Sequence, residues 1–168
     1  WIGGRSSTLS NTAAGYTTLG GQFQFAAVAG AETDYALFAF QVPAQTATNQ
    51  GRTLIIHGIS IDTINTGAAV ATSATVLQWG IAFDGSAVSL ATADGAATKA
   101  PRRIPVGFQS FPIGAAIAAH ATTLSKVFQQ PLAVNAGNYL HVFLKIPIGT
   151  ATASQIIRGT VTIDATWE

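Results

Sequence analysis

The sequence predicts an all-β protein: an antiparallel β-sandwich, jelly-roll-like in its connections, with an extended N-terminal arm. The chain has 168 residues, which is the size of one ordinary domain. Several segments alternate side chains with the period of two that a β-strand requires, and no long segment has the period of a helix. We therefore expect an arm over residues 1–20 and a single sandwich domain over residues 21–168.

The arm is predicted because Ser, Thr, Gly and Asn predominate in residues 1–20 and the few apolar residues follow neither period. Such an arm is either disordered or ordered by lying on a neighbouring subunit. Trp1, Ile2 and Tyr16 suit docking on a neighbour, and with Arg5 they form the first group of candidate contact residues. The first residue is Trp1 rather than Met, which indicates a processed or trimmed chain.

The first three predicted strands cover residues 35–42, 52–63 and 76–83. In the first, both faces carry mostly apolar side chains, so both are expected to be largely covered. The third places Leu77, Trp79, Ile81 and Phe83 on one face and then meets Asp84-Gly85, a strong turn signal. In the second, strict alternation predicts one apolar face of Ile55, His57, Ile59 and Ile61, and a second face of Leu54, Ile56, Gly58, Ser60 and Asp62.

The clearest alternation lies near the C-terminus, in residues 139–146 and 156–167. Each segment predicts one core face and one more polar face. In the first, the core face holds Leu140, Val142, Leu144 and Ile146, and the other face holds Tyr139, His141, Phe143 and Lys145. In the second, Trp167 shares the core parity of Ile157.

The connections between strands carry their own signals. Residues 131–134 form a short apolar strand, and the turn residues 135–138 make a hairpin or tight corner before the next strand. The long connections at residues 84–103 and 146–155 suit Greek-key or jelly-roll crossings. The Ala-rich residues 113–121 are expected to form at most one or two helical turns, because Gly114 and the nearby Thr and Pro residues limit a helix.

Charged residues are scarce. They make up 9% of the chain, against a usual figure of about 25%, while 48% of the chain is hydrophobic. A surface this poor in charge is expected to be covered by neighbouring subunits or by neutral polar side chains, which predicts a homo-oligomer. No stretch approaches the roughly 20 apolar residues of a membrane-spanning helix. A net charge of +1 argues against direct binding to nucleic acid, and the lack of cysteine excludes disulfides and thiolate metal sites.

The residues able to carry chemistry are few: three histidines, His57, His120 and His141, and seven carboxylates. None of them falls into zinc-ligand spacing, and no Gly-x-Ser-x-Gly segment occurs around Ser86 or elsewhere. The alternative is that the scattered histidines converge in space. The local pattern predicts no catalytic residue, no metal site and no cofactor, and hence a protein that is not an enzyme.

Lys99, Arg102 and Arg103 form the one concentration of charge, in the predicted polar connection between strands. They belong either to a solvated loop or to a contact with an acidic patch on a neighbouring subunit. We include them in the second group of candidate contact residues. Among the tryptophans only Trp1 is expected to be exposed, which leaves no aromatic platform of the kind that sugar-binding modules present.

Several features together resemble the decoration or cement proteins of tailed-phage capsids, which are small β-sandwich and jelly-roll proteins. They are the cysteine-free, charge-poor chain rich in Thr, Ala and Gly, the N-terminal arm, the corner PLAVNAGNYL at residues 131–140 and the closing strand TVTIDATW at residues 160–167. The resemblance spans residues 21–168 and lies in composition and topology, so it assigns no individual binding residue.

This resemblance implies a structural protein on the surface of a virion capsid. Its partners would be further copies of itself, in a trimer or dimer, and a major capsid protein, whose subunit contacts it would reinforce as a symmetric oligomer. The alternative is a receptor-binding or carbohydrate-binding β-sandwich module on a virion or cell surface.

Overall fold

The computed structural model describes residues 23–26, 33–48, 50–70, 73–85, 91–93, 102–147 and 155–168, with only the backbone described at 23–26, 33–39, 84–85, 91–93 and 102. These residues form strands, turns and connections, and no helix occurs among them. Within these ranges, accordingly, no helix has the length and apolarity that crossing a membrane requires. The predicted arm at residues 1–20 lies outside the described ranges.

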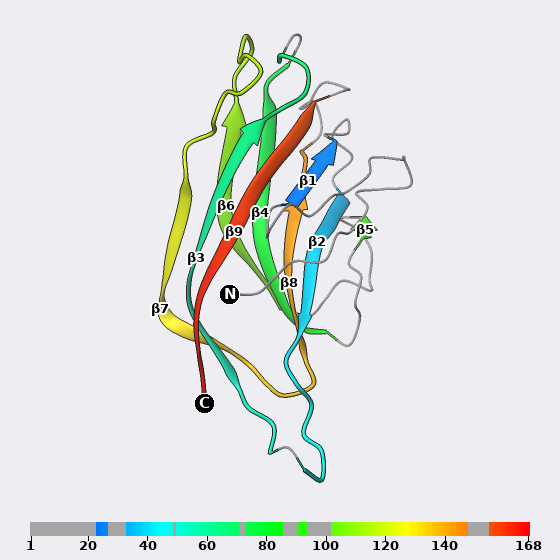
Figure 1. Cartoon of the computed structure of the whole chain (residues 1–168), viewed down its shortest axis with the longest axis vertical. Helices are drawn as coiled ribbons and strands as arrows, with labels where there is room; N and C mark the ends of the chain where they lie inside the picture. The colour runs from blue at the N-terminus through cyan, green and yellow to red at the C-terminus, as the bar shows by residue number, and fades with distance from the viewer. Residues whose placement is uncertain are drawn as a thin grey trace.

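Nine strands form two antiparallel sheets (Figure 1). One sheet has four strands in the order β1-β9-β3-β7, and the other has five in the order β5-β2-β8-β4-β6. The all-β prediction and the antiparallel pairing are therefore confirmed. The strands are β1 (Phe23–Ala26), β2 (Thr33–Gln41), β3 (Leu54–Asn65), β4 (Thr75–Gly85), β5 (Ala91–Ala93), β6 (Arg102–Phe111), β7 (Leu124–Val134), β8 (Tyr139–Lys145) and β9 (Ile156–Trp167).

The pairing of these strands is nested along the chain. β1 pairs with β9, β2 with β8, β3 with β7 and β4 with β6, each in antiparallel register. Two further pairs, β3 with β9 and β4 with β8, complete the sheets, and β5 adds to the free edge of β2. The chain thus folds back on itself as a ribbon and distributes successive strands between two layers.

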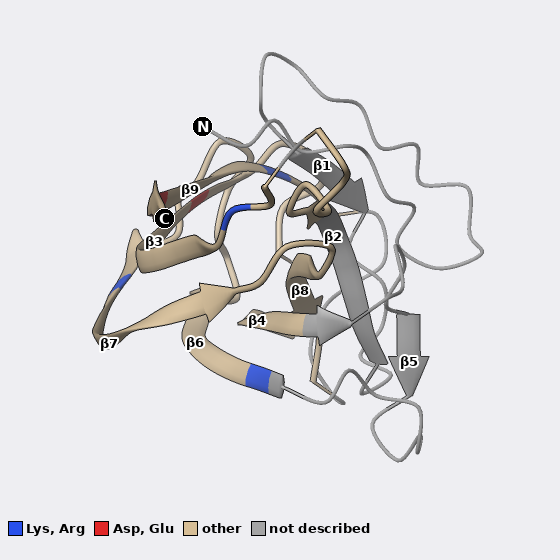
Figure 2. Ribbon diagram, turned by 90° about the horizontal axis from the view of Figure 1, so that it is seen from below, with Lys and Arg blue, Asp and Glu red and all other residues tan. Residues whose placement is uncertain are grey.

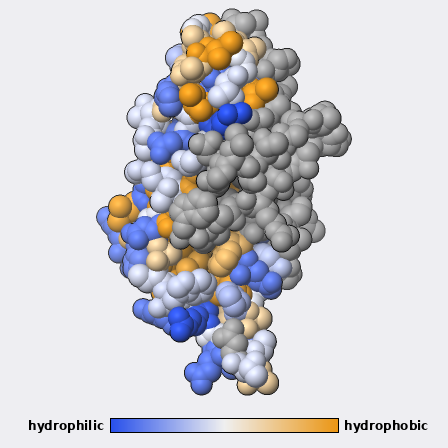
Figure 3. Space-filling view, in the orientation of Figure 1, coloured by the Kyte–Doolittle hydropathy of each residue, from blue (hydrophilic) through white to orange (hydrophobic). Residues whose placement is uncertain are grey.

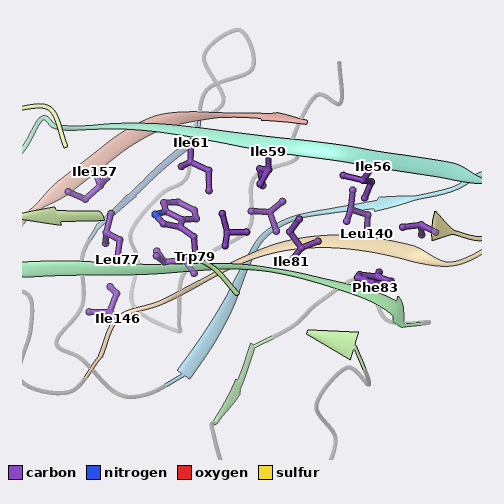
Figure 4. Packing of buried hydrophobic residues seen from close by; sticks show 14 of the residues in the cluster. Ile56, Ile59, Ile61, Leu77, Trp79, Ile81, Phe83, Leu140, Ile146 and Ile157 are labelled. Atoms are coloured by element: carbon purple, nitrogen blue, oxygen red, sulfur yellow. The ribbon is translucent and has the colours of Figure 1, made fainter. Parts of the chain in front are cut away.

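The core lies between the two layers, as a β-sandwich-like fold requires. Ile56, Ile59 and Ile61 of β3 face residues of β4 and β8 across the interior (Figure 4). Trp79 of β4 and Leu140 of β8 are fully buried there. The predicted core rows of β4 and β8 are both confirmed, because all their members are at most 2% exposed.

The strict alternation predicted for residues 52–63 is wrong, because β3 contains a bulge. Ile56 pairs with Ala165 of β9, and Gly58 pairs with the adjacent residue Asp164. His57 is therefore an extra residue in β3 that has no counterpart in β9. The extra residue changes which positions face inward: Leu54 and Ile56 are buried before the bulge, and Ile59 and Ile61 after it. His57 and Asp62, predicted on opposite faces, consequently share the outer face.

The second face of β8 is also buried, which the sequence did not predict. His141 is 1% exposed and Phe143 is 7% exposed, although both lie on the side of the strand away from the sandwich interior. Phe143 packs flat over Gly80 of β4, where an added Cβ would lie 2.2 Å from the ring. A glycine is needed on β4 because the ring occupies the space of a side chain.

Connections at one end of the molecule form a tight corner. Gly137 adopts a φ of +82°, and its N–H donates to the carbonyl of Val42 at 2.9 Å. The N–H of Asn138 donates to the carbonyl of Asn135 at 3.1 Å, which closes the turn. β7 and β8 belong to different sheets, so of the two predicted forms the segment is the corner and not a hairpin.

Two expectations about connections are wrong, one for residues 84–103 and one for the start of β7. Residues 102 and 103, expected at the end of a polar connection, begin β6, and β5 lies within residues 84–103 as well. Residues 113–121 contain turns and an isolated bridge, which keeps to the expected limit of one or two helical turns, and Ala118 has a φ of +70°. β7 begins at Leu124, seven residues before the predicted strand start at Pro131. β6 and β7 escape prediction because each is an edge strand interrupted by a proline, which a sheet tolerates only at its edges.

These two edge strands lie next to each other and close one side of the sandwich, as the end-on view shows (Figure 2). Lys126 Nζ of β7 donates to the carbonyl of Pro105 in β6 at 2.6 Å. Gly107 of β6 approaches Leu124 of β7 so closely that an added Cβ would lie 2.8 Å from a Leu124 methyl carbon.

Candidate functional site

The predicted contact residues fall mostly outside the described ranges. Trp1, Ile2, Arg5, Tyr16 and Lys99 lie there, so their roles stay predictions. Arg102 is described by its backbone alone, as the first residue of β6.

Arg103 is the one predicted contact residue whose side chain is described. It lies in β6, with its guanidinium carbon 5.3 Å from the centre of the Phe143 ring. Burial lowers the pKa of this guanidinium, because the charged form loses hydration. Arg103 is thus packed against the outer face of the five-stranded sheet and does not belong to a solvated loop.

The three histidines lie in different parts of the fold. His57 Nε2 is 2.9 Å from Thr166 Oγ1 on the outer face of the four-stranded sheet. His120 is exposed in the β6–β7 connection, and His141 is buried on β8, where its ring stacks on Tyr139 with centroids 5.9 Å apart. The described residues contain no group of three or more His, Asp or Glu side chains that could hold a metal ion.

A buried amide links the two layers. Gln109 Oε1 accepts hydrogen bonds from Trp79 Nε1 at 3.0 Å and from Thr63 Oγ1 at 3.1 Å. Its Nε2 donates to the carbonyls of Ile61 at 3.1 Å and Thr122 at 2.8 Å. Both oxygen lone pairs and both N–H groups are therefore used, which makes this cluster a structural tie between β3, β4 and β6 rather than a reactive centre.

The outer face of the four-stranded sheet is rich in hydroxyl groups that bond to neighbours. Ser60 Oγ lies 3.0 Å from Ser125 Oγ, and Thr123 Oγ1 donates to Asp62 Oδ1 at 2.5 Å. A shallow hollow of about 190 Å³ opens beside the β3 bulge, where Gly58 has no side chain and Val127 is 82% exposed. This face carries charged side chains of both signs, among them Asp62, Lys126 and Asp164, and its hydroxyl groups are bonded to side chains of neighbouring strands.

Two exposed large apolar side chains lie at one end of the sandwich, in what we call the apical cap: residues 66–70 and 112–121. Ile113 is 62% exposed and Ile117 is 60% exposed. The cap contains no Asp, Glu, Lys or Arg. Apolar surface gathers at this end in the space-filling view (Figure 3), over the β3–β4 and β6–β7 connections seen at the top of Figure 1.

Backbone hydrogen bonds hold the cap in one shape. Ala118 N–H donates to the carbonyl of Asn65 at 2.7 Å, and Asn65 N–H donates back to the carbonyl of Ala119 at 3.0 Å. Val70 N–H donates to the carbonyl of Ala115 at 3.0 Å. The cap is therefore an extension of the sheet that starts where β3 ends.

Trp167 occupies the opposite end of β3, where it pairs with Leu54. Its side chain is 44% exposed, although it has core parity in β9, so the expectation that it would be buried is wrong. The ring centroid lies 6.3 Å from that of Phe40, at a tilt of 59°. The core ends before this last residue of the strand, which leaves the indole partly exposed.

Sequence reasoning missed both the cap and the exposed Trp167. The Ala-rich composition of residues 113–121 was the available signal, since an apolar segment without period or core parity has no inward face. Compared with family models and with curated proteins, the chain matches none of them.

Proposed function

We propose that this protein is a structural subunit of a virion, of the capsid decoration or cement type. It would sit on the capsid surface as a symmetric oligomer and reinforce contacts between major capsid subunits. The observation that carries the proposal is the set of exposed apolar side chains on a charge-poor sandwich with nested strand pairing.

The nested pairing supports a jelly roll as the finer description of the fold. Leaving out β5, the first strand pairs with the last, the second with the second last, and so on inward. A ribbon of eight strands wrapped in this way into two sheets is the arrangement of jelly rolls, which serve in viral capsids as well as in lectins and cupins. The fold therefore admits a capsid role without selecting it.

The character of the surface favours the structural role among these. The exposed apolar side chains Phe108, Ile113, Ile117 and Val127 are each at least 60% exposed, in a chain of which only 9% is charged. Surfaces of this kind are suited to contact with other subunits. Outer hydroxyl groups of β3 and β7 hydrogen-bond to each other. Groups used in this way suit a structural surface better than a ligand-binding site.

Co-sedimentation with capsid shells tests this proposal. Purified protein is mixed with candidate shells that lack it, the shells are pelleted, and the bound protein is measured against its concentration. We expect binding to saturate at a fixed molar ratio of this protein to the major capsid protein. Shells assembled in the presence of this protein should contain it at the same ratio. Failure to bind any shell, together with monomeric mass in light scattering, would contradict the proposal.

A glycan-binding role is the second candidate, and the exposure of Trp167 favours it. A partly exposed indole beside the Phe40 ring can stack on a sugar ring. In this case wild-type protein binds a glycan in isothermal titration calorimetry, Trp167→Ala abolishes the heat, and Trp167→Phe retains part of it. Absence of binding by the wild type across a glycan array would remove this candidate.

A further inference from the structure

We infer that the hollow beside the β3 bulge receives an arginine side chain of a partner protein. We call this place the bulge hollow, and it is lined from three strands by Gly58 and Ser60, by Ser125 and Val127, and by Thr162 and Asp164. The inference deepens the proposed function, because it rests on that function for the identity of the partner, a subunit of the shell.

The bulge in β3 creates the hollow. Ile56 pairs with Leu132 of β7 and Gly58 pairs with Val127, so residues 128–131 leave the register between them. Gly58 adds no side chain at this point, and a Cβ there would lie 3.1 Å from the carbonyl oxygen of Lys126. The hollow of about 190 Å³ is smaller than the roughly 300–1,000 Å³ of small-molecule pockets, which suits a single side chain.

The lining of the bulge hollow is mostly apolar. Val127, which pairs with Gly58, is 82% exposed, so its methyl groups border the hollow in contact with water. An aliphatic stem laid along these methyl groups removes apolar surface from water on both sides of the contact. Long basic side chains have such a stem and keep the charged group at its end hydrated or paired.

The one uncommitted charge at the hollow is negative. The Asp164 carboxylate is exposed, and no hydrogen bond or ion pair engages it within the part of the chain that the structure describes. The Lys126 ammonium, in contrast, donates to the carbonyl of Pro105 on β6 at 2.6 Å. Ser60 Oγ and Ser125 Oγ are bonded to each other. A cationic group of a partner therefore gains an ion pair at the hollow, and an anionic group is repelled.

The shape and chemistry of the hollow favour arginine over other ligands. A metal ion needs several ligands, and the described residues contain no group of three His, Asp or Glu side chains that could hold one. A sugar ring is favoured by an aromatic platform, and no aromatic residue is among those that line the hollow. The planar guanidinium of arginine can donate to a carboxylate and a hydroxyl together, here Asp164 and Thr162, while its stem covers Val127.

A titration followed by NMR tests the inference on the full chain. Isotope-labelled protein receives a blocked Gly-Arg-Gly peptide, and a matched peptide carries citrulline, which has the shape of arginine without its charge. We expect saturable shifts of the amide signals of Gly58, Ser60 and Val127, with a dissociation constant on the order of millimolar for a single side chain. The citrulline peptide is expected to bind roughly fivefold more weakly.

The test variant is Asp164→Asn, which keeps the shape of the side chain and removes its charge. The matched control is Asp62→Asn, which makes the same change on the same sheet face, at a carboxylate bonded to Thr123 outside the hollow. The test variant is expected to bind the arginine peptide roughly fivefold more weakly, and the control less than about twofold more weakly. Circular dichroism checks that both variants keep the fold.

Four results would overturn the inference. They are unchanged amide signals of the hollow up to the solubility limit of the arginine peptide, equal binding of the citrulline peptide, undiminished binding by Asp164→Asn, and an equal loss of binding in Asp62→Asn. The last result would mean that the whole sheet face attracts cations and that the hollow has no role of its own.

Co-sedimentation with shells separates this inference from the proposed function. Peptide binding that depends on Asp164, in a protein that binds no shell, supports the arginine site and contradicts the capsid role. Shell binding by a protein that does not bind the peptide contradicts the inference alone. Where the protein binds both, Asp164→Asn is expected to lower the affinity for shells and Asp62→Asn to leave it unchanged. Equal shell binding by wild type and both variants would overturn the assignment of the hollow to a shell contact.

Discussion

At the scale of single residues, the packing of the two sheets depends on a few positions where the neighbouring side chains restrict which residue type fits. Gly80 gives the Phe143 ring its place on β4, and Gln109 satisfies polar groups from three elements within the core. Both positions carry residues that strand propensity disfavours or leaves neutral. Their contacts come from strands that are distant in the sequence, so their roles follow from packing.

Gly80→Ala is expected to lower the free energy of unfolding by about 1–3 kcal/mol, because the added methyl group overlaps the Phe143 ring. Urea denaturation measures this loss. Combining the substitution with Phe143→Leu should restore part of the stability, because the smaller side chain vacates the space. If the two losses were simply additive, the overlap would not be their cause.

Gln109→Leu is expected to be costly for a different reason. The substitution leaves Trp79 Nε1, Thr63 Oγ1 and two backbone carbonyls without their partner in a buried region. Each unsatisfied group costs about 1–3 kcal/mol, so a loss of at least ~2 kcal/mol is expected in thermal or urea unfolding. The control is Ser110→Ala at the exposed neighbouring position, which should change stability little. A stability loss no larger than that of the control would show that the Gln109 hydrogen bonds do not stabilise the contact between β3, β4 and β6.

At the scale of elements, the edge strands β6 and β7 carry features that oppose pairing with another chain. Each has a proline, Pro105 and Pro131, and each departs from regular register with its neighbour. In β7 the departure spans residues 128–131, opposite the bulge at His57. Proline, bulges and lysine are the means by which edge strands avoid uncontrolled growth of a sheet.

Pro131→Thr is expected to raise the rate of aggregation, because it restores an N–H donor on an edge strand. Light scattering during incubation at elevated temperature measures the rate. Ala133→Thr, at another exposed position of the same strand, adds the same side chain without adding a donor. Equal rates for the two variants would mean that the proline has no protective role.

At the scale of the whole molecule, one core holds both layers together. Its buried apolar members lie between Val42 and Ile157 in the sequence. All the pairs that define the nested ribbon lie between Phe23 and Trp167. The stability of the sandwich is therefore expected to be independent of residues 1–20.

Deletion of residues 1–20 is expected to leave the midpoint of thermal unfolding unchanged within ~2 °C, because every core member among the described residues is retained. Differential scanning calorimetry measures the midpoint. Binding to shells is expected to weaken in the same variant, since Trp1, Ile2, Arg5 and Tyr16 are predicted contacts. A chain that fails to fold without these residues would contradict the division into arm and domain.

The sequence alone determined the all-β character, the core rows of β4 and β8 and the turn at residues 135–138. These features depend on alternation or on local turn chemistry, which adjacent residues specify. In the candidate surfaces it determined only the residue types, such as the charge-free composition of residues 112–121.

Only the tertiary structure decided the bulge at His57, the burial of both faces of β8, the place of Arg103 and the exposure of Trp167 and the cap. The bulge exists because β9 has one residue fewer than β3 at that point. Exposure depends on which distant segments cover a side chain, and alternation gives the side of a strand but not what lies over it.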